Sequence, residues 1–141
     1  MEEKLWLILS LAFLTTFLTV GIPYWQIPYS QLSLPTSIYG FGLWLIFIMP
    51  IVLRVASNAS LSQSFMIIGC SVPAMVLVRV TMDLLIDPTS HNLWPFEIIV
   101  ATGLGLGIAF AGTIFGSLLG FILKRLFGYR NKMSEQDYPT K

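Results

Sequence analysis

Charged residues are scarce in this sequence. They make up 11% of its 141 residues, whereas hydrophobic residues make up 55%. Soluble domains contain about 25% charged residues, so this composition argues against a soluble fold. The formal net charge of +1 gives no indication of a nucleic-acid partner. We therefore expect an all-α, polytopic membrane protein whose first partner is the lipid bilayer.

Reactive and metal-binding side chains are also few. With Cys70 as the one cysteine and His91 as the one histidine, the sequence has no disulfide framework and no Cys/His metal pattern. It also lacks a GxSxG elbow, an HExxH motif and a phosphate-binding glycine-rich loop followed by lysine. We expect no catalytic residue, no metal and no cofactor. One functional alternative is an intramembrane enzyme that acts on lipid.

Four apolar segments approach the length of about 20 residues that a membrane helix needs. We expect one transmembrane domain of residues 1–132, with four helices at about 5–22, 38–56, 65–86 and 96–123. The polar tail, residues 133–141, is expected to be disordered. Pro50 and Pro73 predict bends in the second and third helices. No cleavage site closes the first segment before Pro23, which predicts a retained helix rather than a signal peptide.

Lysine and arginine are absent from the first and third connections between these helices. Apart from Arg79, the basic residues lie on the N-terminal flank, in the second connection or in the C-terminal tail. Cytoplasmic loops are enriched in basic residues, so we expect both termini in the cytoplasm. The first connection, residues 23–39, is aromatic and uncharged, and we expect it along the outer membrane surface. The absence of an organellar presequence favours a bacterial cytoplasmic (inner) membrane.

Arg79 is the exception, because it lies within the third apolar segment, where an unpaired guanidinium is costly. Asp83 follows one helical turn later and Asp87 one turn after that, so the spacing predicts an ion pair on one helix face. We expect a buried polar cluster of Arg79, Asp83, Asp87, His91 and Glu97. Either this cluster neutralises Arg79 and holds the third helix in place, or it lines an outward cavity that binds a ligand or passes an ion.

Small residues recur along the fourth expected helix at steps of three or four. The resulting packing stripe consists of Ala101, Gly105, Ala109, Gly112, Gly116 and Gly120. Such residues let a second helix backbone approach closely, which is a common way for membrane helices to associate. The spacing does not decide whether that second helix belongs to this chain or to another copy.

Two further functional hypotheses follow from these features. The first is a non-enzymatic accessory or assembly subunit of a larger membrane complex, indicated by the small extramembrane mass, the aromatic connections and the small-residue helix. The second is a homo-oligomeric channel or small transporter with an outward polar cavity around Arg79 and Asp83. A homo-oligomer or a larger membrane-protein partner is expected under these hypotheses.

Overall fold

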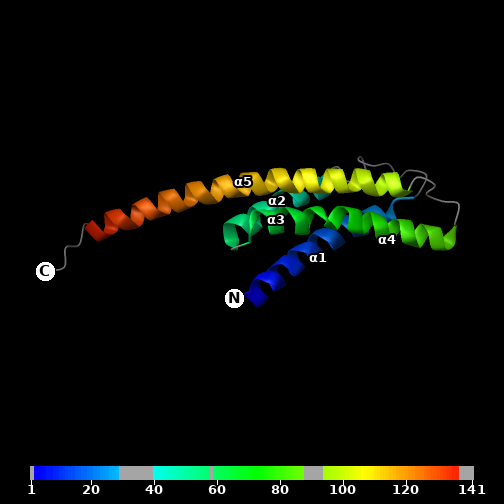
Figure 1. Cartoon of the computed structure of the whole chain (residues 1–141), viewed down its shortest axis with the longest axis horizontal. Helices are drawn as coiled ribbons and strands as arrows, with labels where there is room; N and C mark the ends of the chain where they lie inside the picture. The colour runs from blue at the N-terminus through cyan, green and yellow to red at the C-terminus, as the bar shows by residue number, and fades with distance from the viewer. Residues whose placement is uncertain (1, 29–39, 58, 88–93, 137–141) are drawn as a thin grey trace.

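The computed structural model describes residues 2–28, 40–57, 59–87 and 94–136, with side chains described as far as Leu126. Within these ranges every element is a helix, which confirms the expected all-α class. The helices are α1 (Glu2–Gln26), α2 (Phe41–Ala56), α3 (Leu61–Gly69), α4 (Ser71–Ile86) and α5 (Trp94–Gln136). Figure 1 shows them side by side in one elongated bundle, with α1 inclined to the others.

Three stretches of helix are long and apolar enough to cross a membrane: Glu3–Gln26, Leu61–Ile86 and Trp94–Leu126. The apolar helix α2 is shorter. Its 16 residues span about 24 Å, less than a hydrocarbon core of about 30 Å. It begins at Phe41 because Gly40 has φ 92°, a non-helical conformation that glycine adopts readily. The fold thus has three helices of membrane length and one shorter apolar helix.

Helix α1 continues through Pro23 to Gln26, beyond the expected end at residue 22. A proline inside a membrane helix removes one hydrogen bond without necessarily ending the helix. This extension brings two aromatic residues into the bundle instead of onto a surface loop. Tyr24 is 1% exposed, and Trp25 packs edge-on against Phe17 with ring centroids 5.4 Å apart. The rest of the expected aromatic loop, residues 29–39, lies outside the described residues.

The expected third helix is divided at Cys70 into α3 and α4. Helix α3 starts earlier than expected because Ser60 and Gln63 form a capping box. The Ser60 hydroxyl accepts from the Gln63 main-chain N–H, and the Gln63 side chain accepts from the Ser60 N–H. The division lies just before Pro73, which has no N–H to donate to the Gly69 carbonyl group. The helix is therefore interrupted within one turn of the proline for which a bend was predicted.

Helix α5 has 43 residues and is about 64 Å long. It extends far beyond the other helices, as its orange and red part shows in Figure 1. The helix includes residues 133–136, which were expected to be disordered, and the rest of the expected tail lies outside the described residues.

The two ends of the bundle differ in which helices meet there. At one end, here called the Arg79 end, α1 and α4 end and α5 begins. At the opposite end, here called the Arg54 end, α2 ends and α3 begins. Between these ends the lateral surface carries large apolar side chains on each of the long helices, including Leu14, Leu77 and Phe115. Such a surface suits contact with lipid.

Candidate functional site

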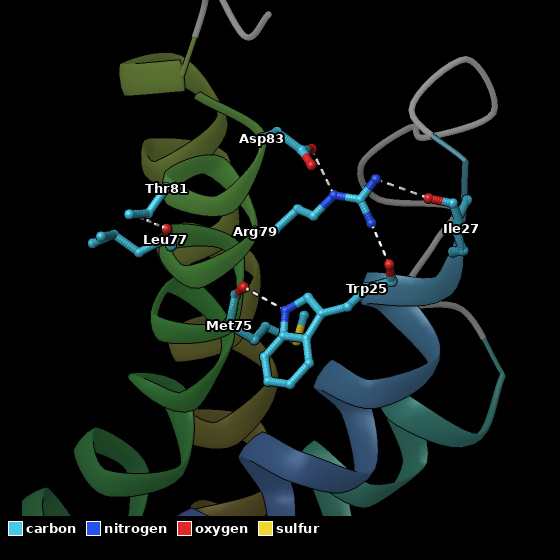
Figure 2. A network of polar contacts seen from close by, with 7 residues as sticks. All are labelled: Trp25, Ile27, Met75, Leu77, Arg79, Thr81 and Asp83. Carbon is cyan, nitrogen blue, oxygen red and sulfur yellow. Dashed lines mark hydrogen bonds and ion pairs between the residues drawn. The ribbon is translucent and has the colours of Figure 1, made fainter. Parts of the chain in front are cut away.

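Arg79 lies on α4 and is 8% exposed. Its Nε donates to the Asp83 carboxylate at 2.6 Å, which forms the expected ion pair. Its Nη1 donates to the Trp25 main-chain carbonyl oxygen, and its Nη2 donates to that of Ile27 at 3.0 Å. Figure 2 shows these three hydrogen bonds spreading from one guanidinium toward α4 and the end of α1. Every nitrogen of the guanidinium therefore has an acceptor.

The carbonyl groups that Arg79 contacts lie at the C-terminal end of α1. The last carbonyls of a helix have no partner within the helix and carry the negative end of its dipole. An arginine at this place supplies both hydrogen bonds and a favourable charge. Trp25 joins the same two helices in the opposite direction, because its indole Nε1 donates to the Met75 carbonyl oxygen on α4 at 2.9 Å. The end of α1 is thus bound to α4 by reciprocal hydrogen bonds.

Tyr24 belongs to this site although it was expected on a surface loop. Its hydroxyl group is buried and has no hydrogen-bond partner among the described residues. The charges of Glu97, Arg79 and Asp83 all act on this hydroxyl, so the four side chains share the Arg79 end. Tyr24 continues the buried face of α1 at steps of three or four, after Leu9, Ala12, Thr16 and Val20. The sequence did not reveal this face, because α1 is apolar on all its sides.

The other expected cluster residues occupy the rim of this end. Asp87 follows the last residue of α4, is exposed, and donates its N–H to the Asp83 carbonyl oxygen at 2.8 Å. Glu97 lies in the first turn of α5 and is half-buried. Asp83, Asp87 and Glu97 all have interaction partners. His91 lies outside the described residues, and within them no His, Cys, Asp and Glu side chains form a group suited to a metal ion.

The polar contacts at the Arg79 end join α1 to α4. The Arg79 guanidinium is occupied by one carboxylate and two helix-end carbonyls, and the ion pair lies on one face of a single helix. These contacts favour the alternative in which the cluster neutralises Arg79 and holds α4 against its neighbours. They do not present the guanidinium to an incoming anion.

The expected small-residue stripe of α5 faces the other helices. Five of its residues are buried and Gly120 is half-buried. A methyl group added to Gly112 would overlap the Phe47 carbonyl group of α2, and one added to Gly116 would lie 2.7 Å from the Ile51 Cα. This part of the stripe therefore provides close packing within the chain, against α2.

The stripe also packs against the junction of α3 and α4. A methyl group on Gly105 would overlap the Gly69 carbonyl oxygen and crowd the side chain of Val72. This carbonyl is the one that Pro73 leaves without its usual helical donor. The missing Cβ of Gly105 thus lets α5 lie directly over the irregular point of the neighbouring helix.

A second set of small residues, Gly103, Gly107 and Ala111, forms another face of α5, here called the open face. All three residues are exposed, and a methyl group on either glycine would meet no atom within 4 Å. Gly107 lies about 200° around the helix from Gly105, so the open face is directed away from the packed stripe. These residues lie outside the small-residue stripe expected from the sequence, where no role was predicted for them.

No protein-family model, no curated protein and no solved structure matches this chain. The function of the chain is therefore inferred from its own contacts and surfaces.

Proposed function

We propose that this protein is a non-enzymatic accessory or assembly subunit of a larger membrane complex. In this proposal the open face of α5 packs against a transmembrane helix of a partner protein. The observation that supports it is the exposure of Gly103 and Gly107, which have no packing role within the described part of the chain. The function is thus one of binding within the membrane.

A glycine inside a helix lowers helix stability by up to about 1 kcal/mol relative to alanine, so its presence there calls for a structural explanation. Three glycines of the packed stripe, Gly105, Gly112 and Gly116, are explained by packing, since a larger side chain at these positions would overlap a neighbouring helix. Gly103 and Gly107 have no such neighbour, and their φ angles lie outside the left-handed region. Packing against a helix from another protein would explain them, because small residues four apart are typical of close helix pairs in membranes.

The packed stripe shows what such a surface accommodates. At Gly112 and Gly116, residues four apart on the same helix, α2 approaches until a methyl group no longer fits. The open face has the same spacing and is bordered by Phe110 and Ile114, which are 45% and 41% exposed. These side chains can form the edges of the contact, whose centre is made by main-chain atoms.

The proposal includes the orientation and the host membrane. The basic residues Lys4, Arg54, Lys124 and Arg125 belong to the side of the bundle where α1 begins and α2 ends, which supports cytoplasmic termini under the positive-inside rule. We place α2 as a fourth, shorter crossing, with Arg54 near the membrane boundary. A bacterial inner membrane is the proposed host. The channel alternative has less support because Arg79 already has acceptors on all its nitrogens.

The test compares the intact protein with a variant changed only on the open face. The tagged full-length chain is extracted from its native membrane in a mild detergent, and the mass and composition of the particle are determined. We expect the unchanged protein to purify with a larger partner in fixed stoichiometry. The double variant Gly103→Leu/Gly107→Leu should lose this partner yet require at least as much denaturing detergent to unfold as the unchanged chain.

The matched control is Ser10→Leu, which adds the same side chain at an exposed position of α1. It should keep the partner. Retention of the partner by the double variant would contradict the proposed interface. A particle containing only copies of this chain would identify the occupant of the open face as a second copy and would contradict the accessory role.

A further inference from the structure

Arg54, near the end of α2, is held in place by two other parts of the chain. Its Nε donates to the Ser117 hydroxyl on α5 at 2.9 Å, and its Nη1 donates to the Ala59 carbonyl oxygen between α2 and α3. Ser117 donates in turn to the Thr113 carbonyl oxygen at 2.8 Å, which orients its oxygen toward the arginine. The guanidinium therefore has a fixed position at the Arg54 end.

Arg54 differs from Arg79 in having no anionic partner within the described part of the chain, where the ion pair found is Arg79–Asp83. Its neighbours are a hydroxyl and a carbonyl, which accept hydrogen bonds but carry no full charge. The guanidinium is half-buried in an apolar bundle, so an external anion would be attracted to it. Its Nη2 forms no hydrogen bond to a described residue and is available to that anion.

A second cation, Lys124, follows on α5, and the packing of α5 on α2 indicates its level in the bundle. The two helices run in parallel: Gly116 lies against Ile51, and one turn later a methyl group on Gly120 would lie 3.9 Å from the Arg54 carbonyl oxygen. The next turn on this face of α5 carries Lys124, which is exposed. This register places Lys124 beside the connection between α2 and α3, the same segment to which Arg54 is bonded.

We propose that Arg54 and Lys124 together bind the phosphate group of one anionic lipid. A guanidinium offers directed N–H donors to phosphate oxygens, and a lysine adds a mobile positive charge. Both residues lie where the apolar helices reach the end of the bundle, which is the level of the lipid headgroups in the proposed orientation. The site lies on α2 and the inner part of α5, and it does not depend on the open face or on a partner protein.

The test measures lipid binding to the purified full-length chain in an uncharged detergent by native mass spectrometry. Phosphatidylglycerol, which is anionic, is compared with zwitterionic phosphatidylcholine and with inorganic phosphate alone. We expect one preferentially retained phosphatidylglycerol. Lys124→Gln should weaken its binding about fivefold, because a basic residue near an anionic surface contributes about 1 kcal/mol. Arg54→Lys keeps the charge but removes the anchored guanidinium, and it should weaken the binding further.

Lys4→Gln is the control, since it removes an exposed lysine from a different helix, α1. It should leave phosphatidylglycerol binding unchanged. An equal loss in this control, or equal binding of the two lipids, would overturn the proposal by showing only general charge or apolar attraction. An unchanged affinity of the folded Lys124→Gln variant for phosphatidylglycerol would also overturn the proposal. Displacement of the lipid by millimolar phosphate would support phosphate recognition, whereas retention of phosphate in preference to phosphatidylglycerol would overturn the assignment to a lipid headgroup.

Discussion

The packed stripe and the open face of α5 consist of the same residue types at the same spacing, but their surroundings are opposite. At Gly105, Gly112 and Gly116 of the packed stripe a methyl group would overlap the main chain of α2 or α3, and at Gly103 and Gly107 of the open face it would meet nothing within 4 Å. The packed glycines are thus explained by this chain, whereas those of the open face need a helix from elsewhere. The comparison separates residues that maintain the fold from residues proposed to mediate association, and each has its own test.

The largest effect is expected from Gly112→Leu on the packed stripe. The leucine side chain would meet the Phe47 main chain, which cannot move without separating α2 from α5. We expect the free energy of unfolding to fall by about 3 kcal/mol, at the upper end of the range for overpacking. Reversible unfolding in mixed detergent and dodecyl sulfate micelles measures this change. A stability equal to that of the unchanged protein would show that the two helices are not closely packed.

The next largest effect is expected at Arg79, whose contacts are all inside the bundle. Arg79→Gln removes one cationic donor from two helix-end carbonyls and from the Asp83 carboxylate, so we expect a loss of about 2 kcal/mol. Faster hydrogen exchange in the last turn of α1 should accompany it. The control Arg125→Gln, at an exposed position of α5, should change neither quantity. If Arg79→Gln abolished solute flux and left stability unchanged, this result would favour the channel hypothesis over a role of Arg79 in holding α1 and α4 together.

Gly107→Leu makes on the open face the same replacement that Gly112→Leu makes on the packed stripe, so the effects at the two faces can be compared directly. Since a side chain here would meet no other part of the described chain, stability should not fall, and it should rise by up to about 1 kcal/mol because leucine favours a helix more than glycine does. Association with the partner should weaken at least about tenfold, which corresponds to about 1.4 kcal/mol. Unfolding and copurification measured on one preparation give both values. A marked loss of stability without loss of the partner would reverse the roles of the two faces.

The smallest effect is expected from Tyr24→Phe. The hydroxyl of this residue is buried without a hydrogen-bond partner in the part of the chain that the structure describes, so its removal takes away no hydrogen bond seen there. We expect stability within about 0.5 kcal/mol of the unchanged protein, or slightly above it. The paired variant Trp25→Phe removes the bond to Met75 and should cost about 1 kcal/mol. A loss at Tyr24 as large as that at Trp25 would show that the hydroxyl has a partner.

Much of this architecture could be predicted from the sequence, because hydrophobic runs and their length carry a strong signal in membrane proteins. The all-α class and the Arg79–Asp83 pair followed from composition and from spacing along one helix. The contacts of Arg79 with Trp25 and Ile27 could not be predicted, since they join residues far apart in the sequence. Pro23 suggested an early end to α1 and so hid Tyr24, because a proline can either end a membrane helix or lie within it.

The two faces of α5 show a different limit of sequence analysis. Periodicity identified small residues on α5 but could not tell which of them another helix of this chain would cover. That distinction depends on how α2, α3 and α4 are arranged in space. It became visible only when the atoms around each glycine were compared.

The proposed function is tested most directly by photo-cross-linking in the native membrane from a reactive side chain placed at Ala111, on the open face. Leu85 of α4, which is 82% exposed, is the control position. Our account predicts one defined protein adduct from position 111 and none from position 85. Adducts with lipid alone at both positions, or the same protein adduct from each, would contradict a docking role for the open face of α5.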